Sequence, residues 1–247
     1  MAQSTGFYNG LIGTVYAAAI AEQHFSEDAV FERILAETGG TALELGSGTG
    51  RLLLRLLGDG HQVHGLEISE EMTEVCLAEA ARLGLQPVVH RGSFAPLDGA
   101  LSGYAAMFCP LNAFSFIVDD DLARESVRSY AAGLAPGGVL ALTGSAGDSL
   151  LRTRTDWVRR PDVPIPGGDV AQVTERRTVE PDGRCLKVER VIEVVDPDGR
   201  VRAREDGVQL RRLRPVAELA ELFAEAGLIR LHAYGSDVDH VLTGWKE

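Results

Sequence analysis

Residues 41–67, with the sequence TALELGSGTGRLLLRLLGDGHQVHGLE, constrain the fold more than any other stretch of the chain. A short apolar segment with one acid, Glu44, leads into glycines at alternate positions over 46–50. Leucines at helical spacing follow, and a second apolar segment, 63–66, ends at the acid Glu67. The pattern predicts a buried strand, a tight turn, a helix and a second strand. Such a unit suits a nucleoside, because backbone N–H groups at the turn face one end of it and the distant carboxylate reaches the ribose hydroxyls.

The spacing of the glycines separates two kinds of nucleotide site. A dinucleotide site favours G-x-G-x-x-G, in which the third glycine lets the helix pack closely on the strand beside a pyrophosphate. This chain has G-x-G-x-G, and the sixth position is Arg51. The acid Glu44, two residues before the first glycine, would repel a pyrophosphate and suits a ligand with a cationic amino group. An unrelated glycine turn in another α/β domain is the alternative interpretation.

The segments ELGSGTG (44–50) and GLEISEEM (65–72) resemble the first two motifs of class I S-adenosylmethionine (SAM)-dependent methyltransferases. LAPGGVLAL (134–142) is similar to a later part of the same family. The resemblance covers 41–145 and, more loosely, 214–244. It implies SAM as the cofactor. The cofactor-binding residues that it implies are Glu44, Gly46, Ser47, Gly48, Gly50, Arg51, Glu67, Ile68, Met72, Ser93, Phe94, Cys109 and Leu111.

Three residues are candidates for catalysis or for contact with the methyl acceptor. His240 lies in the stretch that joins the last two predicted strands, and histidine is the commonest general base. Tyr16 belongs to N-terminal helices that, by the resemblance, form a lid over the active site. Asn112 follows the fourth predicted strand, at the sheet edge where ligands bind in open parallel sheets. Each also has a purely structural interpretation. His240 and Tyr16 can be packed side chains, and Asn112 can cap a turn. His24 is a further candidate base.

The order of elements and the resemblance together imply an α/β fold. We expect a seven-stranded, mostly parallel sheet flanked by helices, with an N-terminal helical lid and an antiparallel β insertion after the fifth strand. The lid is expected over 1–40, the SAM-binding Rossmann-like core over 41–145 and 214–247, and the inserted β cap over 146–213. The cap differs from the rest in charge, because 151–214 carries 15 Lys and Arg against 12 Asp and Glu in a chain of net charge −12.

Local signals predict several boundaries. Strand-like segments at 169–179, 185–195 and 201–213 are separated by Pro-Asp-Gly turns and indicate an antiparallel sheet. Ser26 is predicted to cap a helix that begins at residue 28, and Ser69 a helix that begins at residue 70. The segment 134–138 is predicted as a turn ahead of the fifth strand.

Composition limits the partners. The negative net charge disfavours a nucleic-acid-binding surface spread over the protein. The three cysteines lack CxxC spacing, so neither a disulfide framework nor a metal site is predicted. No secretory signal and no apolar segment long enough to span a membrane is recognisable, and a cytoplasmic location is expected. The expected partner is a small-molecule methyl acceptor, and a homodimer is possible.

Three functions fit the sequence. The first is SAM-dependent methyl transfer to a nitrogen or oxygen of a small molecule such as a natural product, an amino sugar or an amino acid. The second is a protein that binds SAM without methylating, such as a cyclase, a decarboxylase or a regulator, because a fold does not settle a function. The third is an NAD(P)-dependent oxidoreductase, which Arg51 and Glu44 oppose.

Overall fold

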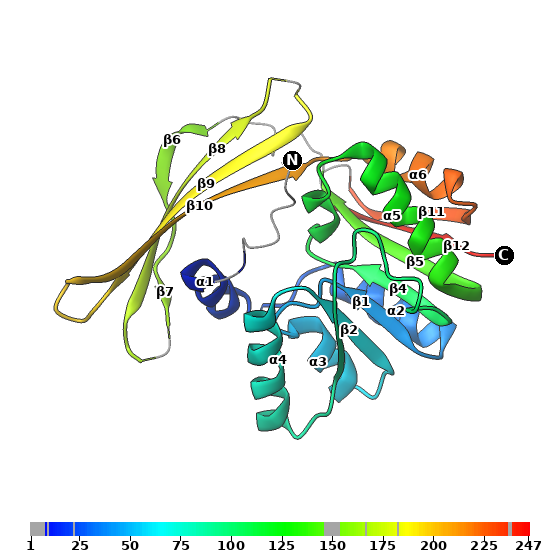
Figure 1. The fold of residues 1–247 in the computed structure, drawn as a ribbon, viewed down its shortest axis with the longest axis horizontal. Coiled ribbons are helices and arrows are strands. Elements are labelled where there is room, and N and C mark those ends of the chain that lie inside the picture. Colours follow the sequence, from blue (N-terminus) through cyan, green and yellow to red (C-terminus); the bar gives the residue numbers. More distant parts are fainter. Residues whose placement is uncertain are drawn as a thin grey trace.

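The computed structural model describes residues 8, 10–21, 23–145, 154–165, 167–181, 183–236 and 239–247. These residues form a seven-stranded core sheet and a second, five-stranded sheet. Helix α1 (Gly10–Ile20) lies between the two (Figure 1). In the part of the chain that is described, no helix is long and apolar enough to cross a membrane.

The core sheet is mostly parallel, as predicted. Its strand order is β11-β12-β5-β4-β1-β2-β3, and only β12 runs antiparallel to its neighbours. All four residues of β1 are buried, because helices cover both faces of the sheet. The strands are β1 (Ala42–Leu45), β2 (Val63–Glu67), β3 (Val88–Arg91), β4 (Tyr104–Cys109), β5 (Leu134–Ser145), β11 (Ile229–Gly235) and β12 (Asp239–Trp245).

Two hydrophobic clusters hold the helices against the core sheet. Helices α2 (Asp28–Thr38), α3 (Arg51–Gly58) and α4 (Glu70–Leu83) contribute Phe31, Leu53 and Cys76 to the cluster on one face. On the opposite face, α5 (Asp120–Gly133) contributes Tyr130 and α6 (Val216–Glu225) contributes Phe223. The five named side chains are 0% exposed, so burial of apolar area on both faces fixes the layers.

Side-chain caps set two of the helix starts. The Ser69 hydroxyl accepts a hydrogen bond from the Met72 N–H at the start of α4, which confirms that prediction. Asp119 caps α5 in the same way through the Leu122 N–H, and such caps contribute about 1 kcal/mol each. The prediction for Ser26 is wrong. The residue before α2 is Glu27, which makes no side-chain cap, and its carboxylate instead reaches the Leu111 N–H at 2.6 Å.

The second sheet is antiparallel and follows the order β10-β9-β8-β6, with β7 paired to β8. Three of its strands lie where the sequence predicted them, and two short strands were missed in a stretch rich in proline. Its strands are β6 (Arg154–Arg159), β7 (Val163–Pro164), β8 (Val170–Val179), β9 (Cys185–Val195) and β10 (Val201–Arg212).

The predicted turn at 134–138 is also wrong. These residues begin β5, with Leu134 paired to Tyr104 ahead of an irregular step in the register. The Gly137 N–H donates to the Lys246 carbonyl at 3.1 Å, so the backbone here is bonded across the sheet.

The first turn of helix α1 makes hydrogen bonds to α4, which packs on the core sheet, and to β10 of the second sheet. The Gly10 N–H donates to the Glu71 carboxylate of α4 at 2.6 Å, and the Leu11 N–H donates to the Glu205 carboxylate of β10 at 2.8 Å. Ile12 and Val15 pack with Ile192 on one face of the second sheet. These bonds satisfy backbone donors that a helix start leaves open, and they hold α1 over the carboxyl ends of the core strands. Its role as a lid stays a prediction.

Candidate active site

A cavity of about 1190 Å³, including its open mouth, lies at the carboxyl ends of β1, β2 and β4. The core lines one end of it, and α1 and β10 contribute to the other. The lining residues from the core are Glu44, Gly46, Ser47, Gly48, Thr49, Arg51, Leu52, Glu67, Ile68, Ser69, Met72, Ser93, Phe94, Ala95, Pro110, Leu111, Ala113, Phe116 and Ile117. Those from outside it are Tyr8, Tyr16, Ile20 and Gln209.

Glu67 organises the glycine turn at the core end of the cavity. One carboxylate oxygen accepts from the Gly48 N–H at 2.8 Å, and the other accepts from the N–H groups of Ile68 at 2.9 Å and Ser69 at 2.8 Å. Gly48 has a φ of 56°, which favours glycine, and a Cβ there would meet no protein atom within 4 Å. A side chain at this position would therefore project into space that the cavity occupies.

Glu44 is a buried acid without a full set of partners. Its side chain is 2% exposed, and its Oε2 has no hydrogen-bond partner among the described residues. Burial raises the pKa of Glu44 to about 8, with the nearby Arg51 opposing that rise. A buried carboxylate oxygen left open on a cavity wall is expensive unless a ligand donor satisfies it. The buried hydroxyl of Ser47 also has no hydrogen-bond partner among the described residues.

Arg51 lines the cavity but is held by a neighbouring acid. Its guanidinium donates to both carboxylate oxygens of Asp28, at 2.8 and 3.0 Å, and to the Gln23 carbonyl at 3.1 Å. Asp28 also accepts from the Phe25 N–H, so the pair ties α2 to the start of α3. Although burial alone would raise the pKa of Asp28, the Arg51 guanidinium holds it below its usual range. These hydrogen bonds fix the Arg51 side chain in place where it lines the cavity.

The outer end of the cavity is aromatic. The Tyr8 ring centroid lies 4.5 Å from that of Tyr16 and 5.7 Å from that of Phe116. Gln209 of β10 is 0% exposed and reaches the same wall, with its amide nitrogen 3.5 Å from the Tyr8 hydroxyl. Burial raises the pKa of Tyr16 above its ordinary value, so its phenol stays protonated near neutral pH.

Glu27 is a titratable group beside the cavity that the sequence did not single out. Burial raises its pKa to about 7, against the lowering effect of the Leu111 N–H that it accepts. Leu111 lines the cavity and has a φ of 52°, directly after β4. A carboxyl group that titrates near neutral pH therefore lies one backbone group away from the site.

Most of the cofactor residues predicted from the sequence line this cavity. Gly50 and Cys109 do not. Gly50 packs where a Cβ would collide with Cys76, which explains the glycine by close packing. Cys109 is 0% exposed within β4. Ser93 lines the cavity, and its hydroxyl accepts from the Ala95 N–H at 2.9 Å.

The three candidates for catalysis do not lie in the same place. Tyr16 lines the cavity, whereas His240 and Asn112 do not. His240 is 5% exposed on β12, opposite Gly144, where its ring leaves no room for a Cβ on that glycine. Asn112 sits in the left-handed region at φ 56°, with its N–H on the Thr143 hydroxyl at 2.7 Å. His240 and Asn112 therefore support the site's edge in this structure, and a direct role for either stays a prediction. His24 is exposed and bonds Arg55 at 2.7 Å.

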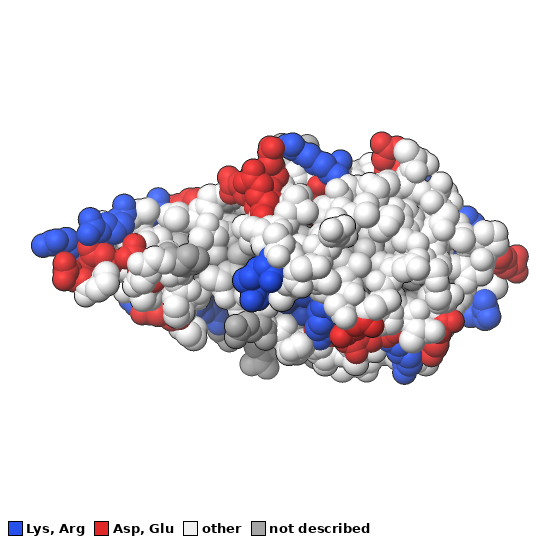
Figure 2. Space-filling model, turned by 90° about the horizontal axis from the view of Figure 1, so that it is seen from below, with Lys and Arg blue, Asp and Glu red and all other residues white. Residues whose placement is uncertain are grey.

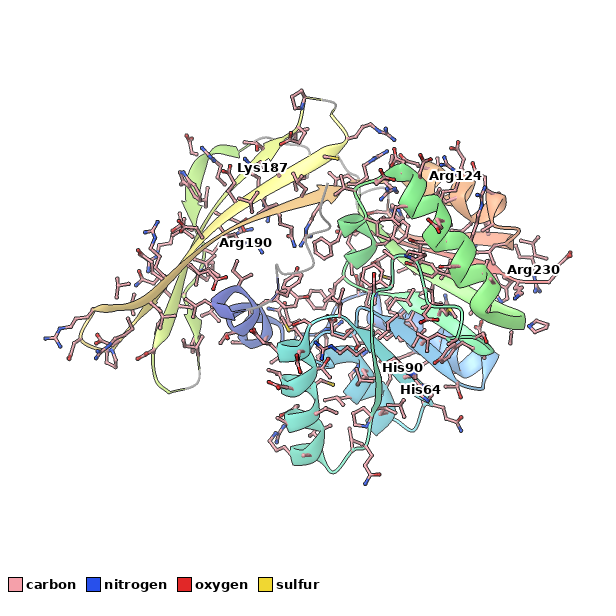
Figure 3. The ribbon with its side chains drawn as sticks, viewed as in Figure 1. His64, His90, Arg124, Lys187, Arg190 and Arg230 are labelled. Carbon is pink, nitrogen blue, oxygen red and sulfur yellow. The ribbon has the colours of Figure 1, made fainter. Side chains whose placement is uncertain are left out.

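Other polar clusters lie away from the cavity. His64, His90 and Tyr104 lie within 3.4 Å of one another on the core sheet, and Figure 3 shows the two histidines side by side on the core, far from the second sheet. Burial and the neighbouring His90 lower the pKa of His64. Among the described residues, no group of three or more His, Cys, Asp or Glu side chains is placed to hold a metal ion.

Comparison with known proteins gives the class. Residues 42–138 match a family described as a methyltransferase domain. A search of curated protein sequences finds no match to this chain.

The sugar N-methyltransferase KedS8 from Streptoalloteichus sp. has a TM-score of 0.77 at 18% identity, over 97% of this chain and 94% of that one. CalS10, an amino pentose methyltransferase from Micromonospora echinaspora solved with SAM bound, has a TM-score of 0.67 at 23% identity, over 97% and 98%. A SAM-dependent methyltransferase from Clostridium acetobutylicum has a TM-score of 0.74 at 15% identity, over 95% and 97%.

Residues 42–138 therefore match a methyltransferase domain, and the chain has the fold of the class I SAM-dependent methyltransferases. This confirms the resemblance drawn from the segments 44–50 and 65–72. SAM is the cofactor of this class, and the site suits it. The open Glu44 oxygen matches a cationic amino group, and the glycine turn that Glu67 braces leaves room for a nucleoside against its backbone.

Proposed function

We propose that the chain transfers a methyl group from SAM to a nitrogen or oxygen of a small molecule, with the amino group of an amino sugar or a related natural product as the first acceptor to test. The observation that carries the proposal is the single cavity joining two unlike ends. One end holds Glu44 and Glu67, and the other holds Tyr8, Tyr16 and Gln209. The similarity to KedS8, a sugar N-methyltransferase, and to CalS10, an amino pentose methyltransferase, supports the choice of acceptor class.

The chain's own residues would bind and orient. Glu44 would accept hydrogen bonds from the cofactor's amino group through its open oxygen, and Glu67 would receive the ribose hydroxyls while keeping the turn in place. Bound SAM supplies a methyl group on a sulfonium that is already activated. The aromatic wall of Tyr8, Tyr16 and Phe116 would exclude water from the acceptor and hold it for in-line attack, and such alignment supplies much of the acceleration available to enzymes.

Proton handling depends on the acceptor. A neutral amine needs no base, and the protonated phenol of Tyr16 would then serve to orient it. An ammonium or a hydroxyl needs a proton acceptor, and Glu27, whose pKa is about 7, is the buried carboxyl that lies beside the site's Leu111.

The test is a two-part assay on the full chain. Calorimetry measures binding of SAM and, separately, of NAD, and a panel of amines, amino sugars and hydroxyl compounds is then screened for S-adenosylhomocysteine (SAH) formation. We expect SAM binding without NAD binding, and SAH released only with an acceptor present. Tight NAD binding without SAM would reverse the class of ligand.

The second candidate is a SAM-binding protein without methyl transfer. It shares the cofactor end, so binding alone does not separate the two functions. A SAM-bound chain that forms no SAH with any member of a broad panel would favour this candidate, whereas turnover would exclude it. Among the described residues, the aromatic end that Tyr8, Tyr16 and Phe116 form favours an acceptor site, because flat apolar rings can hold an acceptor against the cofactor end.

A further inference from the structure

Arg211 stands apart from the other arginines of the second sheet. Where side chains are described, Arg211 and Arg230 are the two arginines with no carboxylate within 4 Å. Arg230 lies at the end of the core away from the second sheet, with its guanidinium 5.7 Å from the Trp245 ring centroid (Figure 3). A guanidinium without a counter-ion attracts an anion. The surroundings of each of these two arginines therefore indicate which anion it can bind.

Arg211 is not a lining residue of the cavity, but its contacts place it beside the outer end. Its Nε donates to the Gln209 Oε1 at 3.0 Å, and its Cζ lies 5.0 Å from the centroid of the Phe116 ring. Both partners line the cavity. Its positive charge also reaches the phenol of Tyr16, where it opposes the rise in pKa that burial causes. The hydrogen bond to Gln209 uses Nε, and the described residues offer no partner for the two Nη groups.

The face of the second sheet around Arg211 carries more basic than acidic charge. Arg177, Val188 and Gln209 stand opposite one another on successive strands and so share a face, on the side where α1 packs. In the next row, Glu175 stands opposite Arg190, which Figure 3 labels on the second sheet.

Glu175 is shared by three arginines on this face. Arg160, Arg177 and Arg190 approach it at 2.6, 2.9 and 3.2 Å. One carboxylate cannot neutralise three guanidinium groups. Glu205 is a second acid on this face, where it accepts from the Leu11 N–H, so the face that bears Gln209 and Arg211 has four arginines against two acids.

The face of the molecule drawn in Figure 2 shows a different pattern. In the view of Figure 2, Lys and Arg lie interspersed with Asp and Glu on the described part of the surface, without a continuous basic band. The core end of the cavity differs, because two acids, Glu44 and Glu67, line it.

We propose that the methyl acceptor carries an anionic group, a carboxylate or a phosphate, and that Arg211 binds it while the acceptor's nitrogen or oxygen lies at the core end of the cavity. The inference rests on the proposed function, because it names the acceptor class of the same site. The Nη groups form the two parallel hydrogen bonds that either anion accepts. The Gln209 carbonyl and the Phe116 ring hold the guanidinium in place.

The test measures anion binding without requiring turnover. Inorganic phosphate and malonate are titrated calorimetrically into the full chain, with and without SAH. The variants are Arg211→Gln, Arg211→Lys and the matched control Arg230→Gln. We expect saturable binding of at least one probe to the wild type, at least tenfold weaker binding to Arg211→Gln, an intermediate loss for Arg211→Lys, and no change for Arg230→Gln. The probe that binds tells phosphate from carboxylate.

A second arm uses matched acceptors. Glucosamine is compared with glucosamine 6-phosphate, and glycinamide with glycine, by SAH formation. In the pair whose anion is the probe that binds, we expect kcat/KM to be at least tenfold higher for the anionic acceptor than for the neutral one. Arg211→Gln should lose that preference. Equal anion binding by wild type and Arg211→Gln, or no saturable anion binding by the wild type, would overturn the inference. SAM affinity in each variant reports folding, and a failure of SAM binding in the wild type would count against the proposed function instead.

Discussion

The two ends of the cavity differ in how they are built. The glycine turn and the two acids of the core end come from one continuous stretch of chain, in which the turn and Glu67 are about 20 residues apart. The outer end joins Tyr8, Phe116 and Gln209, which lie about 100 residues or more from one another in sequence. A ligand common to a whole class of proteins can be bound by a local sequence motif. A ligand particular to one protein is met by side chains that only the tertiary fold assembles.

Charge separates the two ends in the same way. Two acids, Glu44 and Glu67, line the core end, whereas Arg211 lies beside the outer end, bonded to the lining residue Gln209. Changes at the core end should therefore alter SAM affinity, and changes at the outer end should alter acceptor use alone. The predictions below test that division.

The largest effect is expected for Gly48→Val. Its φ of 56° strains a β-branched residue, and the added side chain would occupy the cavity against the turn. We expect SAM affinity to fall at least a hundredfold by calorimetry. Gly60→Val is the matched control, because Gly60 also has a positive φ and open surroundings but lies outside the cavity. A Gly48→Val protein that binds SAM as well as the control does would contradict the account of the turn.

Glu67→Ala should weaken SAM binding by about 1–3 kcal/mol, because a buried, charged hydrogen-bond acceptor is lost. The change also frees three backbone N–H groups, including that of Gly48, so the free energy of unfolding should fall too. Calorimetry and denaturant unfolding measure the two effects. Glu70→Ala, at an exposed acid on α4 that pairs with Arg91, is the control. An affinity equal to that of the control would refute the ribose assignment.

SAM binding should release a proton from Glu44. Its pKa is raised to about 8 in the unliganded chain, so it is mostly protonated at neutral pH, and a cationic amino group beside it would lower that pKa. SAM affinity should therefore rise between about pH 6 and 8, by up to tenfold per pH unit. The same raised pKa makes the free energy of unfolding fall as pH rises over that range. Glu44→Gln should remove the Glu44 part of both dependences. Equal proton release by wild type and variant, measured in two buffers, would contradict this role.

The smallest effect is expected for Tyr16→Phe. The phenol is protonated and offers one hydrogen bond, so kcat/KM for the acceptor should fall about fivefold, the value of about 1 kcal/mol, while SAM affinity is unchanged. Tyr104→Phe is the control, because its hydroxyl contacts His64 and His90 away from the cavity. A loss of SAM affinity in Tyr16→Phe would break the division between the two ends.

The sequence predicts the core end well because its signals are local. Gly48 needs a positive φ, Ser69 caps the helix that follows, and Glu67 lies at the tip of the adjacent strand. The order of the core strands follows from the same pattern and the resemblance. The two ends thus differ in what a sequence can reveal.

The outer end and the exceptions depend on tertiary structure. No spacing links Gln209 to Tyr8, and Glu27 comes into play only because its carboxylate turns to Leu111 instead of capping α2. His240 lies at the expected edge, but strand alternation turns its ring toward α6, beside Leu219, instead of into the cavity. Such orientations depend on register, which the sequence alone does not fix.

The most direct test is a crystal structure of the chain with SAM or SAH. The account predicts the ligand in the cavity above β1 and β2, with its ribose hydroxyls on the Glu67 carboxylate, its amino group on the open oxygen of Glu44, and its methyl or sulfur facing Tyr16. A ligand bound outside this cavity, or one seated with its adenosine toward Gln209, would contradict it.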